Sequence, residues 1–241
     1  MPRRSEAEAI KGDDVIHALE AQCKELVALA DELSDDEFSR ETRCPGWTVS
    51  EVVAHIEGMC LRLVGEHSQP AEGEAEIDRV GYYGYDPSSP REDEPEKTFS
   101  EHIRDRVIEE AGGRSPSELR EALRSATEQA MKRVREVPED RVIKRSGHPR
   151  IMFGEFVASR VLEFGVHAMD ISHATLRGER IHPDAAAIVA EILRGRLGAE
   201  LPVGMGWDER TLILTGTGRR QLESNERFIL GPLAEKFPLL S

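Results

Sequence analysis

Four polar side chains share one stripe of a segment that is otherwise apolar. Arg160, Glu163, His167 and Asp170 follow one another at intervals of three, four and three residues. On an ideal helix, which turns by about 100° per residue, all four fall within a sector of about 80°. A Glu and a His at positions i and i+4 stand about 5–6 Å apart at their Cβ atoms, close enough to chelate one ion. The stripe therefore favours a metal site of the kind that helix bundles build from facing helices.

Apolar residues flank this stripe on both sides, which inverts the pattern of a surface helix. They are Leu162, Val166 and Met169 on one side and Phe153, Val157, Phe164 and Ile171 on the other. An unpaired carboxylate buried there is costly, so Glu163 must be paired, metal-bound or protonated. His55, beside Val52, Ile56 and Met59 at the edge of another apolar helix face, offers a third ligand. A His, Glu, His set with an open fourth position is typical of a catalytic zinc site.

Each of these residues also has an ordinary structural interpretation. Glu163 and His167 are compatible with a common i,i+4 pair, or with a buried network that includes Arg160. His55 alone fits a half-buried histidine with satisfied hydrogen bonds. Asp170 fits either a partner that orients His167 or an ion pair with Arg160. Nickel, iron and manganese accept the same ligand types, so the residues alone leave the metal open.

Four long helices must position these side chains. Apolar spacing and capping boxes predict them over residues 13–33, 49–66, 115–137 and 153–175. The remaining pattern predicts shorter helices over 98–110 and 183–196, a strand over 210–215 and a last helix capped by Ser224. The fold class is therefore mainly α. We expect an up-and-down four-helix bundle over residues 1–178 and a small C-terminal α+β region over 179–241.

Residues 68–97 interrupt the helical pattern with four prolines, several glycines and many acids. Loops of this length in compact domains are lids, binding loops or disordered segments. Tyr82, Tyr83 and Tyr85 give this loop an aromatic cluster. A lid that brings these tyrosines over the site and a partly disordered loop are equal alternatives.

Composition excludes several classes of protein. The chain has 32 Lys and Arg against 46 Asp and Glu, a formal net charge of −14. This charge disfavours nucleic acids and anionic membrane surfaces as partners. No apolar run reaches the roughly 18 residues of a membrane span, and we expect no secretory signal. Cys23, Cys44 and Cys60 form no C-x-x-C pair and fit free thiols in a reducing cytoplasm. We expect a cytoplasmic monomer or homodimer that acts on a small molecule.

Three segments carry a resemblance to a known family. Residues 42–56, TRCPGWTVSEVVAHI, are similar to a C-P-G-W-x-V-x-x-V-x-x-H signature. Residues 160–170 are similar to an R-x-x-E-x-x-x-H-x-x-D helix, and residues 230–240, LGPLAEKFPLL, to a common ending of actinobacterial members. Together they resemble the mycothiol-dependent maleylpyruvate isomerase family, within the DinB-like superfamily of metal-binding four-helix bundles.

The resemblance implies a ligand set and a chemistry. His55, Glu163 and His167 would bind a divalent metal, usually Zn²⁺, that activates a low-molecular-weight thiol. Mycothiol is the thiol expected in an actinobacterium, and its thiolate would serve isomerisation or S-transfer on a small electrophilic substrate. In the isomerase an arginine of the C-terminal domain contacts substrate. Arg219 and Arg220 are the nearest candidates here, with a solvated hairpin as the alternative.

Two further residues and two further functions stay open. Trp47 either packs against the start of the His55 helix alone or also lines the pocket. We interpret Cys44 as a packing residue rather than a nucleophile. Because a fold does not fix a function, the same bundle is compatible with a thiol-independent metal hydrolase or pathway-specific isomerase. It is also compatible with a non-catalytic metal- or ligand-binding protein.

Overall fold

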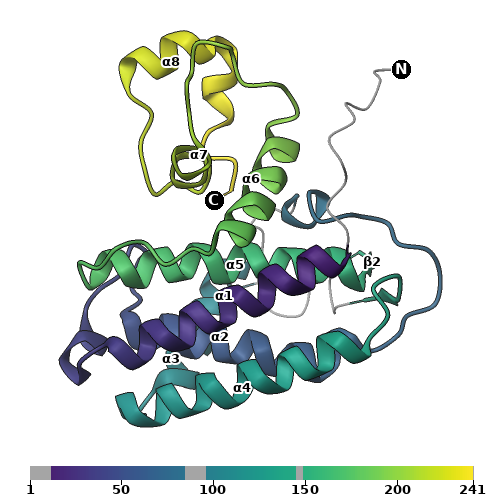
Figure 1. The fold of residues 1–241 in the computed structure, drawn as a ribbon, viewed down its shortest axis with the longest axis vertical. Helices are drawn as coiled ribbons and strands as arrows, with labels where there is room; N and C mark the ends of the chain where they lie inside the picture. The colour runs from purple at the N-terminus through teal and green to yellow at the C-terminus, as the bar shows by residue number, and fades with distance from the viewer. Residues whose placement is uncertain (1–11, 85–95, 145–148, 241) are drawn as a thin grey trace.

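Four long helices form the bundle in the computed structural model, which describes residues 12–84, 96–144 and 149–240 (Figure 1). They are α1 (Gly12–Glu32), α2 (Val49–Val64), α4 (Pro116–Glu136) and α5 (Phe153–Ala174). Helices α1 and α2 each pack against both α4 and α5, so the four close into one ring around the core. Helix α3 (Phe99–Ala111) packs against α2. The predicted mainly α bundle is confirmed.

Capping boxes begin three of the helices where the sequence predicts them. In α4, Ser115 Oγ accepts from the Glu118 backbone N–H at 3.3 Å, and Glu118 Oε2 accepts from the Ser115 backbone N–H at 2.8 Å. The same reciprocal arrangement opens α2 at Thr48 and α3 at Thr98. These bonds satisfy backbone donors that the first helical turn leaves free. The cap at Thr48 therefore fixes the start of the helix that carries His55.

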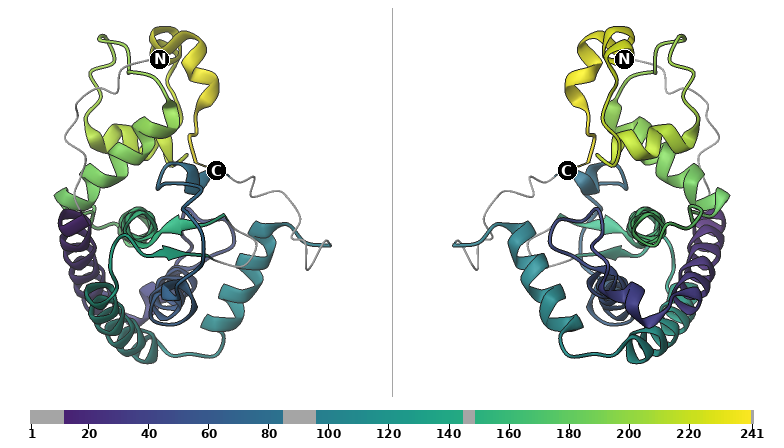
Figure 2. Two further views of the ribbon diagram at one scale, coloured as in Figure 1. Left: turned by 90° about the vertical axis from the view of Figure 1, so that its right-hand side faces the viewer. Right: turned by 90° about the vertical axis from the view of Figure 1, so that its left-hand side faces the viewer.

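The C-terminal region stands above the bundle in both side views (Figure 2). Helix α6 (Pro183–Leu197) packs against α1 and α5, and it also packs against α7 (Glu209–Gly216). Helix α8 (Ser224–Leu230), capped one residue earlier than predicted, leads into the 3-10 helix η4 (Gly231–Lys236). The region is thus anchored to the bundle by α6.

The predicted strand over 210–215 is wrong, because these residues lie in α7. Alternating β-branched residues favour a strand, but the Asp208 carboxylate accepts from the Thr211 backbone N–H at 2.8 Å and opens a helix instead. Every residue from Leu212 to Gly216 is buried. Packing against α6 thus overrides the local preference for a strand.

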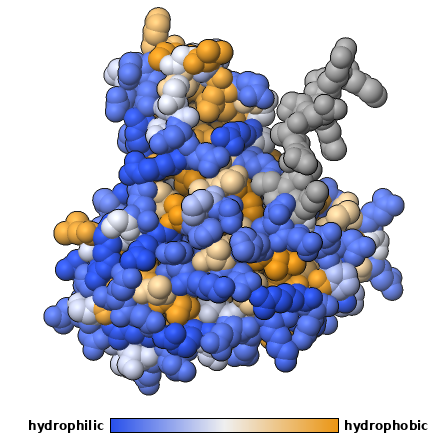
Figure 3. All heavy atoms as spheres, viewed as in Figure 1, coloured by the Kyte–Doolittle hydropathy of each residue, from blue (hydrophilic) through white to orange (hydrophobic). Residues whose placement is uncertain are grey.

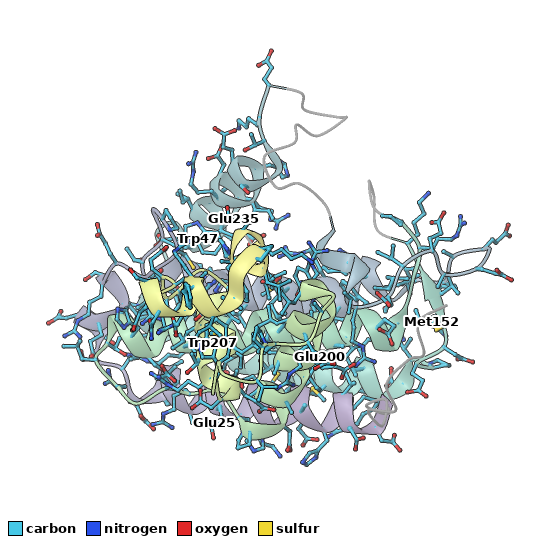
Figure 4. The ribbon with its side chains drawn as sticks, turned by 90° about the horizontal axis from the view of Figure 1, so that it is seen from above. Glu25, Trp47, Met152, Glu200, Trp207 and Glu235 are labelled. Carbon is cyan, nitrogen blue, oxygen red and sulfur yellow. The ribbon has the colours of Figure 1, made fainter. Side chains whose placement is uncertain are left out.

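A short hairpin that the sequence does not predict lies at the start of α5. Strands β1 (Val142–Ile143) and β2 (Ile151–Met152) pair antiparallel. Isolated bridges at Pro70 and Ile77 attach the described part of the 68–97 loop to it. Met152 lies at one edge of the molecule, away from Trp47 (Figure 4). Tyr85 falls outside the described residues.

After these bridges the chain passes close to α6 and forms the 3-10 helix η3 (Gly81–Tyr83). Gly195 makes this approach possible, since a Cβ atom there would lie 2.6 Å from Val80 Cγ2. Because Gly195 has no side chain, the segment that leads into η3 can approach α6 closely.

The exterior is mostly hydrophilic, and Figure 3 shows apolar residues both at the top, over the C-terminal region, and in patches across the bundle below it. Val203 and Phe228 are the most exposed large apolar side chains of that region. None of the helices in the described ranges combines the length and the apolar character needed to cross a membrane.

We expect Gly195→Ala to lower the free energy of unfolding by about 1–3 kcal/mol. Overpacking against Val80, whose χ1 is stiff, outweighs the roughly 1 kcal/mol that Ala gains over Gly in a helix. Urea unfolding measures the difference. Gly178→Ala is the control, because nothing lies within 4 Å of a Cβ atom there and no shift above about 1 kcal/mol is expected. Equal or greater stability of Gly195→Ala would refute the close contact.

Candidate metal centre

A cavity of about 820 Å³ opens between α2, α3, α5 and η3. Its walls include all three predicted metal ligands, His55, Glu163 and His167. His55 projects from α2, and the other two come from α5. Volumes of this size are typical of sites for small molecules.

The three predicted ligands converge on one point. One ligand atom from each of them lies within 4.8 Å of the other two. His167 Nε2 is 3.6 Å from Glu163 Oε2, and the His55 and His167 rings meet edge to face with centroids 5.2 Å apart. The stripe on α5 and the histidine on α2 therefore form a single cluster.

The donor groups of this cluster fit a bound cation. His55 Nδ1 is buried and has no hydrogen-bond partner among the described residues, a cost of about 1–3 kcal/mol if it stays unpaired. His167 Nδ1 lies 3.2 Å from Asp170 Oδ2. Because an ionised carboxylate only accepts, this contact assigns the Nδ1 proton to His167 and leaves Nε2 as a lone-pair donor. Two imidazoles and one carboxylate match the ligand types of Zn²⁺.

The electrostatics of the cluster agree with a cation site. Burial raises the pKa of Glu163, but the His167 hydrogen bond and the Arg160 charge outweigh it and lower this pKa to about 2. Burial, together with the charge of His167, holds the pKa of His55 well below its usual value. Burial also opposes the charge on His167, yet its hydrogen bonds to the acceptors Asp170, Cys44 and Glu163 raise its pKa. A cation would take the place of that proton.

Asp170 is fully buried and joins three segments of the chain. Its carboxylate accepts from Arg219 Nε at 2.9 Å and from Arg219 Nη2 at 2.6 Å. The Cys44 thiol donates to the same carboxylate at 3.3 Å, beside the His167 contact. Burial acts against ionisation, but these donors hold the pKa of Asp170 well below its usual range. Asp170 is therefore a charged acceptor that fixes the His167 ring.

Arg160 does not form an ion pair with any carboxylate in the described ranges. It is 6% exposed and donates to Tyr82 Oη at 3.2 Å and to Ser159 Oγ at 3.1 Å. Its guanidinium also lies 4.8 Å from the centre of the Phe156 ring. Asp170 pairs with Arg219 instead, whereas Arg160 acts on Glu163 through its charge without a direct ion pair.

The predicted aromatic residues lie around the ligand cluster. The buried Trp47 ring lines the cavity with its centroid 4.9 Å from that of His55. Tyr82 also lines the cavity. Tyr83 Oη donates to the Ser159 carbonyl at 2.9 Å and to Glu163 Oε1 at 3.4 Å. The described start of the loop thus contacts the ligand cluster directly.

The two C-terminal arginines have different surroundings. Arg219 lines the cavity and pairs with Asp170, although no hairpin precedes it. Arg220 is absent from the cavity wall and pairs with Glu226 through two contacts of 2.8 and 2.9 Å. Only Arg219 of this pair therefore reaches the cavity.

The sequence does not predict several residues that line the cavity. His67 is buried in the cavity wall, where its ring meets that of Phe156. Arg62 follows His55 by seven residues on α2, a helical spacing that places both on one face. Arg106 has no such local signal, because it depends on how α3 packs against α2. Spacing from His55 could therefore have found Arg62 but not Arg106.

The fold and the site define a helix-bundle protein with a candidate metal-binding cavity. The family model for the mycothiol maleylpyruvate isomerase N-terminal domain matches residues 19–172, and the chain belongs to this family. No curated protein matches the chain.

Two solved structures share the fold. One is the mycothiol-dependent maleylpyruvate isomerase, and the other is a variant of that isomerase with one histidine replaced by alanine. Each is 13% identical, with a TM-score of 0.54, and the match covers 82% of this chain and 74% of that chain.

We expect Asp170→Asn to cost about 3–5 kcal/mol of stability, because it leaves the largely buried Arg219 without its counter-charge. Urea unfolding of the chelator-treated protein measures this cost. The control is Glu179→Gln, which removes a similar two-contact pair with Arg210 at the surface. That change should cost no more than about 1 kcal/mol. Equal costs at the two sites would show that the Asp170 pair is not a buried anchor.

Proposed function

We propose that this chain is a metal-dependent enzyme that activates a low-molecular-weight thiol, mycothiol in the simplest case, for isomerisation or S-transfer on a small electrophile. His55, Glu163 and His167 are the proposed ligands, and Zn²⁺ is the proposed metal. The reaction would take place in the cytoplasm, an assignment supported by the three free cysteines.

One observation carries the proposal: three donor atoms of the residue types that zinc prefers lie within 4.8 Å of one another at the wall of a cavity. Family membership adds the thiol, since the matched family is named for its mycothiol dependence. The cavity leaves room for a thiol and a second small molecule beside the cluster.

A metal bound by these residues supplies a positive charge that lowers the pKa of a coordinated thiol and favours the thiolate. Asp170 keeps the Nδ1 proton of His167 in place, so that Nε2 presents its lone pair to the cluster. Glu163 is ionised and receives a hydrogen bond from Tyr83, which limits its rotation. Trp47 covers one side of His55 and keeps water from that wall.

We expect His55→Ala and His167→Ala each to weaken Zn²⁺ binding by more than about 100-fold, because even partners outside the ligand set are worth about 10–100-fold. Isothermal titration with Zn²⁺ and elemental analysis of the purified protein provide the measurements. His17→Ala is the matched control, since His17 is exposed on α1 and pairs with the exposed Asp184. Full metal stoichiometry in either cluster variant would disprove the ligand assignment.

The thiol step is tested by consumption of mycothiol in the presence of a panel of electrophiles. Zn²⁺-loaded wild type should consume thiol, and His167→Ala should not, because it lacks the charge that favours the thiolate. Turnover of an electrophile without added thiol would point to a hydrolase or thiol-independent isomerase. Tight ligand binding with no turnover would point to a binding protein.

A further inference from the structure

One segment of the chain runs along the face of α5 that carries Glu163. Glu155, Ser159 and Glu163 are spaced by four residues on this helix, so they share one face over about 12 Å of its axis. Arg79 contacts the first of them, and Tyr83 contacts the other two. The segment from Arg79 to Tyr83 therefore spans the same part of α5.

Arg79 ties this segment to α5 through three hydrogen bonds to one carboxylate. Its Nε and Nη2 donate to the two oxygens of Glu155 at 2.8 and 2.9 Å, and its backbone N–H donates to the same group at 2.9 Å. Only 11% of the Arg79 side chain is exposed, and the bond to Glu155 raises its pKa more than burial lowers it. Because a two-contact pair fixes orientation as well as distance, Arg79 anchors the residues that follow it.

The turn that follows this anchor is fixed both within the segment and from α6. Asp78 Oδ1 accepts from the backbone N–H groups of Val80 and Gly81 at 3.0 and 2.8 Å, an arrangement that closes the turn into η3. Val80 lies directly against Gly195, where a Cβ atom would be 2.6 Å from Val80 Cγ2. A displacement of the anchor is therefore passed on to Tyr83 rather than absorbed by the turn.

The Tyr83 hydroxyl lies beside one of the two oxygens of Glu163. It donates to the Ser159 carbonyl at 2.9 Å and faces Glu163 Oε1 at 3.4 Å. The other oxygen, Oε2, lies 3.6 Å from His167 Nε2. The bond to Ser159 fixes the hydroxyl, and its contact with Oε1 then limits the rotation of the carboxylate. Oε2 is thus the oxygen that stays beside the imidazole.

We propose that Arg79 is a positioning residue for the metal cluster: it holds Tyr83 against Glu163 Oε1 and so keeps Oε2 turned toward the imidazoles. Among the described residues Arg79 is not part of the cavity wall, so its effect must pass through the tyrosine. This inference rests on the proposed function, because it takes Glu163 to be a metal ligand. Groups that hydrogen-bond to a ligand commonly change metal affinity by about 10–100-fold.

Carboxyl ¹³C NMR reads the position of Glu163 without a metal. In chelator-treated full-length protein with labelled glutamate, the Glu163 resonance is assigned by its absence from Glu163→Gln. Tyr83→Phe should shift this resonance, because it removes the hydroxyl beside Oε1, and Arg79→Gln should shift it in the same direction. Glu191→Gln is the matched control and should leave it in place. Glu191 Oε2 is 3.8 Å from Arg79 Nη1, and neither atom has a hydrogen-bond partner among the described residues.

Isothermal titration with Zn²⁺ measures the consequence for the cluster. Tyr83→Phe should raise the Kd by about 10-fold, the lower end of the usual range, because its contact with Glu163 is long. Arg79→Gln should raise the Kd by no more than Tyr83→Phe does. The double variant should match Tyr83→Phe alone, since the two residues act in series. Additive effects, or wild-type affinity in Tyr83→Phe, would overturn the inference.

Glu155→Gln removes the same anchor from the side of α5, so it should reproduce the resonance shift even if Arg79→Gln folds poorly. Thermal unfolding identifies the variants that fold. An unchanged Glu163 resonance in a folded anchor variant refutes the inference, whatever the Zn²⁺ affinity and thiol consumption of wild type. If the shifts are found but wild type binds no Zn²⁺, Arg79 still positions Glu163 and only the proposed function fails.

Discussion

The site depends on one buried charge, the carboxylate of Asp170. It has no contact with solvent, and four donor groups from three segments compensate it. These segments are the loop before α2, helix α5 and the turn after α7, so one acceptor fixes their relative positions. Because a buried carboxylate is costly without its donors, His167, Cys44 and Arg219 must all stay in place for the fold to keep Asp170 ionised.

The sign of the charged side chains alternates along the cavity, starting from the Asp170 carboxylate. Arg219 is neutralised by Asp170, and Glu163 is ionised between two imidazoles. Next to Glu163, Arg160 donates to Tyr82 and lies against the Phe156 ring. A cation at the ligand cluster would lie between Glu163 and the two imidazoles. The same stripe that inverts the pattern of a surface helix thus places charged side chains of both signs along one wall of the cavity.

The sequence predicts what local pattern and motif determine. Capping at Thr48 and Ser115 and the stripe on α5 specify the long helices and the ligand cluster, since each signal lies within a few residues. Alternation over 210–215 misleads, because burial against α6 rather than pairing with a strand decides that segment. The role of Arg106 depends on the approach of α3 to α2, a tertiary contact that no local spacing encodes.

Several arginines line the cavity of a chain whose net charge is −14. Such a chain repels anions over its exterior, although screening limits this field to about 8 Å at physiological ionic strength. A short anion that fits within about 820 Å³ leaves the exterior field once it enters the cavity. A long polyanion must keep most of its charges against the acidic surface. The distribution of charge therefore filters ligands by length as well as by sign.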